Sequence, residues 1–168
     1  MGALLRAAPI MAVLLGAGFG VVPVEAKSPP AFSGVTAAAS DQHDVDVSFT
    51  ETGLRPAQLV TDQLRGKATD TYGCYGSDGQ LVATAALIEH PSLQQQYQAN
   101  AGGTIDQAGI AISVLPLNAC PGGRKSYLFK TVFDHLRLTD LTSHLSVDVP
   151  GSFTSCSPAD CLPPPILP

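Results

Sequence analysis

The chain has 168 residues with a formal net charge of −5 and an isoelectric point of about 5.1, a length that suits one domain around a single hydrophobic core. An acidic chain of this kind lacks the basic stripe that nucleic-acid binding requires and the polybasic patch that attracts anionic membranes. We therefore expect no nucleic-acid partner.

The first 26 residues have the pattern of a secretory signal peptide. The segment ending at Arg6 carries one positive charge, residues 7–22 are uncharged, and Val24-Glu25-Ala26 places modest and small side chains where signal peptidase reads them. A permanent anchor is disfavoured, because prolines and glycines keep the apolar run below the roughly 20 residues of a spanning helix. We expect a signal-peptide helix over 1–26, no stable membrane insertion after cleavage, and a secreted protein that is extracellular or loosely associated with the cell envelope.

Downstream of the signal peptide the chain divides into a linker, a domain and a tail. Residues 27–42 are rich in Ser, Pro and Ala and predict a flexible linker. Residues 43–150 predict the domain, and residues 151–168 form a Pro-, Ser- and Cys-rich tail that we expect to be loosely ordered.

Within the domain, apolar and polar residues alternate with the period of a β-strand. The expected strands cover residues 44–50, 60–74, 81–88, 93–99, 110–114, 127–138 and 145–149. About seven or eight short strands, regular turn signals and no amphipathic helix pattern predict an all-β fold, an antiparallel β-sandwich.

The longest alternation, from Val60 to Cys74, contains a glycine and two polar exceptions. Gly66 lies where a bulge or a bend could divide the strand in two. Asp62 and Asp70 fall on the apolar parity, so we expect part of that face to be wet.

All four cysteines lie beyond the signal peptide. An even number in an exported chain predicts two disulfides, whereas a zinc site would need paired Cys or His spacings that are missing here. The four residues are Cys74, Cys120, Cys156 and Cys161.

Several short strings, in order, resemble those of small uncharacterised secreted proteins of actinobacteria. They are Asp44-Val45-Asp46-Val47-Ser48-Phe49-Thr50-Glu51-Thr52-Gly53-Leu54, Tyr72-Gly73-Cys74-Tyr75, Cys120-Pro121-Gly122, Leu138-Thr139-Asp140-Leu141-Thr142 and Val147-Asp148-Val149-Pro150-Gly151. The resemblance implies an immunoglobulin-like sandwich bridged between the two cysteine motifs, and it implies no activity. We accordingly expect the pairs Cys74–Cys120 and Cys156–Cys161, with the first joining the sheets or their rims.

Candidate chemistry is sparse. Asp41, His43, Asp44 and Asp46 cluster at the first strand, but the glycine of a calcium loop is missing, and a solvated strand start is favoured. Serines, histidines and aspartates for a triad are present without a G-x-S-x-G turn to expose a nucleophile. We predict no catalytic residue, no metal ligand and no cofactor.

Two surface features remain, a His–Asp pair that is more typical of surface stabilisation than of a general base, and a few tyrosines that could contact a carbohydrate. An antiparallel register with Leu138 opposite Leu145 would place His135 opposite Asp148 on the outer face, whereas a register two residues longer would separate them. Stacking platforms for a carbohydrate are limited to Tyr75, Tyr97 and Tyr127, because the chain has no Trp.

The sequence favours a secreted, non-catalytic β-sandwich protein with a binding or structural surface role. Its partner is unknown, and a cell-envelope component or an extracellular protein fits the compartment. One alternative is a secreted protease inhibitor that presents the disulfide-braced loop between Cys156 and Cys161. A second alternative is a small secreted hydrolase.

The export signal makes a direct prediction. The protein recovered outside the cytoplasm should begin at Lys27, because cleavage follows Ala26. N-terminal sequencing or intact-mass measurement checks this, and a membrane-retained protein that still carries residues 1–26 would contradict it.

Overall fold

The computed structural model describes residues 28–157 and 161–163, so the predicted signal peptide lies outside the described residues. The strands are β1 (Ala31–Ala39), β2 (Asp44–Thr52), β3 (Leu59–Tyr75), β4 (Leu81–Glu89), β5 (Ser92–Gln98), β6 (Ile105–Ser113), β7 (Lys125–Asp140), β8 (Leu145–Val149) and β9 (Phe153–Cys156). A single 3-10 turn, η1 (Pro121–Gly123), precedes β7. Within these ranges no helix has the length and apolarity needed to cross a membrane.

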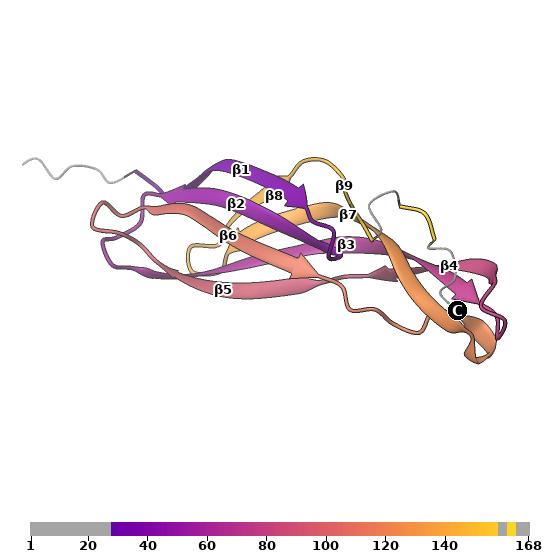
Figure 1. Cartoon of the computed structure of the whole chain (residues 1–168). Helices are drawn as coiled ribbons and strands as arrows, with labels where there is room; N and C mark the ends of the chain where they lie inside the picture. Colours follow the sequence, from indigo (N-terminus) through magenta and orange to yellow (C-terminus); the bar gives the residue numbers. More distant parts are fainter. Residues whose placement is uncertain (1–27, 158–160, 164–168) are drawn as a thin grey trace, which may run out of the picture.

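The strands form two antiparallel sheets. One has three strands in the order β1-β2-β6, and the other has six, in which β4-β3-β7-β8 form the main path while β5 adds to β3 and β9 adds to β7. The smaller sheet packs over one part of the larger one, which extends beyond it toward β4 (Figure 1). The predicted antiparallel β-sandwich is confirmed, with nine strands in the described part of the chain.

Two segments that were expected to be loose are paired strands. The predicted linker contains β1, which pairs with β2 and packs the Phe32 ring edge-on against Phe49 at 5.5 Å. The predicted tail contains β9, which pairs with β7 so that Phe153 lies opposite Phe133. Both predictions were wrong. The residues of β1 are mostly small and give little contrast between the two faces of the strand, and β9 has only four residues, too few to show a period.

The core lies between the sheets and follows the predicted parity. Apart from Leu54, which follows β2, its largest fully buried side chains come from β2, β3, β6 and β7, and these strands have the clearest period of two. The largest are Tyr72, Phe49, Phe133, Leu64, Ile110, Leu136 and Leu138.

Strands β3 and β7 form the axis of the larger sheet, and each is flanked by two short strands in succession. On one side, β5 pairs with residues 59–65 of β3 and β4 pairs with residues 68–75. On the other side, β8 pairs with residues 136–140 of β7 and β9 pairs with residues 130–133. Both flanks are therefore interrupted at the same level of the sheet.

A β-bulge lies at that level. Arg65 pairs with Arg137 and Lys67 pairs with Asp134, so that β7 uses His135 and Leu136 where β3 uses only Gly66. A side chain at Gly66 would be blocked, since its Cβ would lie 2.5 Å from Leu136 Cδ2. The predicted bulge is confirmed, although β3 continues through it without dividing.

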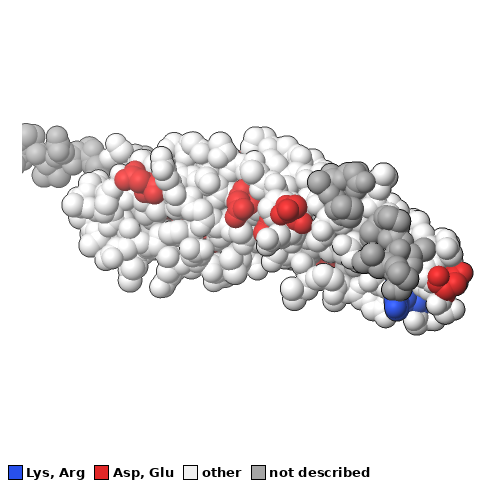
Figure 2. Space-filling view, viewed as in Figure 1, with Lys and Arg blue, Asp and Glu red and all other residues white. Residues whose placement is uncertain are grey.

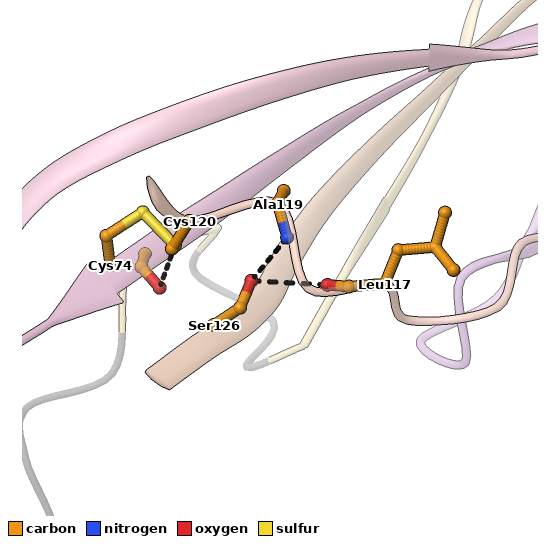
Figure 3. Close-up of a disulfide and its surroundings, with 6 residues drawn as sticks. Cys74, Leu117, Ala119, Cys120 and Ser126 are labelled. Atoms are coloured by element: carbon orange, nitrogen blue, oxygen red, sulfur yellow. Dashed lines mark hydrogen bonds between the residues drawn. A yellow bond between two sulfur atoms is a disulfide. The ribbon is translucent and has the colours of Figure 1, made fainter. Parts of the chain in front are cut away.

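Both predicted disulfides are present, Cys74–Cys120 and Cys156–Cys161. The first ties the end of β3 to the loop before β7 (Figure 3). Ser126 supports this loop, because its hydroxyl accepts a hydrogen bond from Ala119 N at 3.3 Å and donates one to Leu117 O at 3.2 Å (Figure 3).

The two disulfides should contribute unequally to stability. Cys74 and Cys120 are 46 residues apart and Cys156 and Cys161 are 5 apart, for which the chain-entropy relation gives about 4 and about 2 kcal/mol. Replacing the pair Cys74→Ala and Cys120→Ala should thus lower the free energy of unfolding more than replacing Cys156→Ala and Cys161→Ala. Denaturant unfolding of both paired variants measures the difference, and equal losses would contradict it.

Candidate functional site

The outer face of the six-stranded sheet is hollowed at the bulge. Two adjoining depressions of about 630 Å³ and 510 Å³ share Arg65 and His135 in their walls. The first reaches across the interruption between β4 and β5, and the second across the interruption that follows β8. Together they form what we term the outer-face groove, lined by Gln63, Arg65, Gly66, Lys67, His90, Ser92, Asp134, His135, Leu136, Arg137, Asp148, Val149 and Gly151.

Two arginines lie side by side in the groove. Arg65 on β3 and Arg137 on β7 are direct cross-strand partners, an arrangement of like charges that destabilises a sheet. Arg137 has a partial counter-charge, since its Nη1 lies 3.5 Å from Asp148 Oδ1 between two largely exposed side chains, and such pairs contribute little. Among the described residues, Arg65 forms no ion pair within 4.0 Å.

A second charged group stands beside the arginines. The Asp134 carboxylate lies 3.3 Å from Lys67 Nζ and accepts a hydrogen bond from His135 Nδ1 at 2.6 Å. The hydrogen bond from His135 is the main cause that lowers the pKa of Asp134; burial opposes it and Lys67 adds to it. Asp134 is thus held as an anion that positions Lys67 and His135 at the edge of the groove.

His135 occupies a strained backbone position. Its φ is +52°, in the left-handed region, which is uncommon for residues other than Gly, although His, Asn and Asp adopt it more often than the rest. Its side chain is 82% exposed, so packing does not offset the strain. The conformation belongs to the bulge at this position.

The groove is lined by three cationic side chains and two carboxylates, Asp134 and Asp148, so its formal charge is slightly positive in an acidic protein. Three of the chain's nine Lys and Arg residues line it, namely Arg65, Lys67 and Arg137. The face drawn in Figure 2 shows Asp and Glu at several places and Lys or Arg at one end only. Paired guanidinium groups are suited to bidentate contacts with carboxylate, sulfate or phosphate oxygens.

The register settles the position of His135 and Asp148. Arg137 lies opposite Asp148 and Leu138 opposite Val147, which is the longer of the two registers considered. His135 and Asp148 both face outward, as their parity predicts, but they are not cross-strand partners.

The other candidates have varied environments. Asp46 is exposed, while Asp44 is half-buried and accepts a hydrogen bond from Ser40 Oγ. Tyr75 is buried, and Tyr97 packs edge-on against Phe49 at 5.7 Å. The expectation of exposed rings at Tyr75 and Tyr97 was therefore wrong; Tyr127 is exposed.

The interior holds carboxyl groups where a wet face was expected. Asp62 and Asp70 are fully buried, so the prediction of a wet face was wrong although the inward parity was right. Asp62 lies opposite Asp140 on β7, and Glu51 of β2 joins them from the other sheet, also fully buried. The expected strand ended at residue 50, so Glu51 was not expected to be buried, and the sequence gave no pairing for Asp140.

Asp70 belongs to a separate buried network that reasoning from the sequence missed. Thr131 Oγ1 donates a hydrogen bond to Asp70 Oδ1 at 2.7 Å and lies 3.2 Å from His43 Nδ1. Ser155 Oγ of β9 accepts the His43 backbone N–H at 2.8 Å. Burial lowers the pKa of His43 and raises that of Asp70. This Asp–Thr–His set is closed to solvent and joins β9 to the core.

Comparisons with known proteins give no family. No protein-family model matches the chain, and no curated protein matches it. Among solved structures, it is similar to the solution structure of CsgH from R. palustris, with 15% sequence identity, 76% of this chain and 92% of that chain covered, and a TM-score of 0.24. Likeness at this level carries no argument about function.

The strain at His135 can be tested without a ligand. Replacing His135→Gly removes the left-handed penalty of about 1–2 kcal/mol, offset by the entropy of glycine at about 0.5–1 kcal/mol. The variant should therefore be as stable as the natural protein or up to about 1.5 kcal/mol more stable. Denaturant unfolding measures this, with the outward-facing Arg137→Ala as a comparison; a marked loss of stability in His135→Gly would show that His135 is a structural residue.

Proposed function

We propose that the chain is an exported, non-catalytic binding protein that holds an anionic group of an extracellular or cell-envelope partner in the outer-face groove. The signal-like N-terminal pattern supports export. The two disulfides support it as well, because disulfides persist in oxidising compartments outside the cytoplasm.

The observation that carries the proposal is the pair Arg65 and Arg137. Placing two guanidinium groups opposite each other lowers the stability of the sheet. An oxyanion bound between them would accept a charge-assisted hydrogen bond from each guanidinium group, and its negative charge would reduce their mutual repulsion. Lys67, in the wall of the same groove, extends the positive charge along β3, and His90 adds a hydrogen-bonding side chain past the end of β4.

Binding is favoured over hydrolysis by where the reactive groups lie. His43 lies beside the hydroxyl group of Thr131, which hydrogen-bonds to Asp70. All three side chains are buried in the interior, where a substrate does not reach them. Ser92 lines the groove, and within the described residues no hydrogen bond joins it to His90 or His135. The groove thus offers positive charge and hydrogen-bond donors rather than an activated nucleophile.

Binding to three anionic polymers tests the proposal. The mature, oxidised protein should bind at least one of poly-L-glutamate, heparin and polyphosphate, which present carboxylate, sulfate and phosphate groups. The double variant Arg65→Gln with Arg137→Gln should weaken binding at least tenfold, since hydrogen bonds between charged groups are worth about 1.5–3 kcal/mol. Isothermal titration calorimetry at low salt and at physiological salt measures the affinity.

The matched control is Arg124→Gln with Lys125→Gln, which changes the net charge equally at two exposed residues outside the groove. The control should bind like the natural protein. Equal weakening in both double variants would show general electrostatics and no site. A tight complex with a trypsin- or subtilisin-like protease would instead favour the inhibitor hypothesis, and turnover of a generic ester, peptide or glycoside would favour the hydrolase.

A further inference from the structure

Three carboxyl groups from both sheets meet inside one end of the sandwich. Asp62 of β3 and Asp140 of β7 are direct cross-strand partners, and Glu51 is the last fully buried residue of β2. Five of their six oxygens accept no hydrogen bond from an N–H or hydroxyl group of the described residues, and a side-chain hydrogen bond between Glu51 and Asp140, which requires a proton on one of them, adds to the rise in the pKa of Glu51. The sixth, Asp140 Oδ1, accepts the Thr142 backbone N–H at 2.6 Å.

No positive charge faces this cluster. Within the described residues, none of the three carboxyls forms an ion pair with Lys, Arg or His. Strand β5 contributes Tyr97, whose hydroxyl donates to Gly109 O at 2.5 Å, and β6 contributes the apolar Ile105 opposite Glu51. Two charged residues on neighbouring segments, Arg55 and Asp106, are exposed.

An ionised carboxylate in such a place is strongly disfavoured, because burial without a counter-charge or hydrogen bonds leaves its charge unsolvated. Neighbouring carboxylates add repulsion. Burial and the charges of Asp62 and Asp140 raise the pKa of Glu51 to about 8. Burial and Asp140 raise the pKa of Asp62 to about 7, and burial and Asp62 raise that of Tyr97 to about 12.

We infer that Glu51, Asp62 and Asp140 form a proton-dependent latch between the two sheets. With protons retained on Glu51 and Asp62, these two side chains pack as neutral groups beside Asp140, and this end of the sandwich is closed. When the protons are lost, the charges repel one another across the sheet interface, and the end of β2 separates from β3 and β7. The opening is local, because the opposite end of β2 packs through Val45 and Val47 in the apolar core.

The direction of the pH dependence follows from linkage. In the unfolded chain Glu and Asp titrate near pH 4.3 and 3.9, whereas the folded chain holds protons on Glu51 and Asp62 up to about pH 8 and 7. The folded state therefore binds more protons between these limits, and stability falls as the pH rises through this window. Each proton released changes the folding equilibrium by up to about tenfold per pH unit.

Amide hydrogen exchange of the mature protein between pH 5 and 9 tests the latch. After correction for the intrinsic rate, protection of Phe49 and Glu51 should decrease with pH by at least tenfold. Protection of Val45 and Val47 on the same strand should change much less and serves as an internal control. Protection at Phe49 and Glu51 that does not depend on pH would overturn the inference.

Neutral variants separate the latch from other causes. Glu51→Gln and Asp62→Asn, made singly and together, should remove most of the pH dependence at the end of β2, since the amides resemble protonated carboxyls. Asp70→Asn, which alters the other buried acid of β3, should leave that dependence in place. A pH dependence that persists in the double variant would refute the latch.

The latch also differs from a cation site. No cluster of three or more Asp, Glu, His or Cys residues in the described part of the chain has the arrangement of a metal site. Adding Ca²⁺ or EDTA at pH 8 should therefore leave the exchange rates unchanged. Protection restored by Ca²⁺ would show instead that the three carboxylates bind a cation, and the inference would be wrong.

Discussion

The pairing of β3 with β7 is the interaction on which the rest of the structure depends. The two strands pair over nearly their whole length, from Asp62 opposite Asp140 to Tyr75 opposite Lys125. Each provides the edge on which two short strands assemble. Their inward side chains supply much of the core, and their outward side chains line the groove. The remaining strands either extend this axis or cover its inner face.

The bulge in this pairing determines where a surface site can form. A bulge on β7 shifts the register by one residue, so that Leu136 and Phe133, an odd number of positions apart, both point into the core. The chain accommodates this with the left-handed φ of His135 and with a glycine opposite. The interruptions of both flanks at this level leave the outer face open. Groove and bulge are thus consequences of one local irregularity.

The sequence predicted the strands well and the site poorly, for physical reasons. Seven strands were predicted, and the period of two is clearest in β2, β3, β6 and β7, because alternate side chains of these strands are buried in the core. Strand β1 was missed, since its alternating residues are mostly Ala, Ser, Gly and Thr, which differ little in polarity. Asp62 was placed on the inward parity correctly, but whether an inward side chain is wet depends on what covers it, here the three-stranded sheet, from which Glu51 approaches Asp62.

The pairs that matter could not be predicted from the sequence. A period of two leaves registers that differ by two residues equally compatible, so that Asp148 could face either His135 or Arg137. The Arg65–Arg137 pair also requires the bulge, which shifts one strand by a residue relative to the other. Glu51 meets Asp62 and Asp140 only when the two sheets pack, and no spacing along the chain encodes that contact.

Strands β3 and β7 carry two pairs of like-charged residues, one pair acidic and the other basic. Asp62 and Asp140 face each other inside the sandwich, and three positions further along β3 Arg65 faces Arg137 outside it. Like charges opposite each other weaken a sheet, and a fold that retains two such pairs departs twice from the pattern that stability favours. The interior pair is relieved when the carboxyl groups take up protons, because no counter-ion reaches them. The exterior pair is open to solvent, and a bound oxyanion can relieve it. The two pairs differ in their access to solvent and to ligands. This difference follows from the alternation of side chains along β3. Before Gly66, the even positions of β3 point to the core and the odd positions point to the outer face.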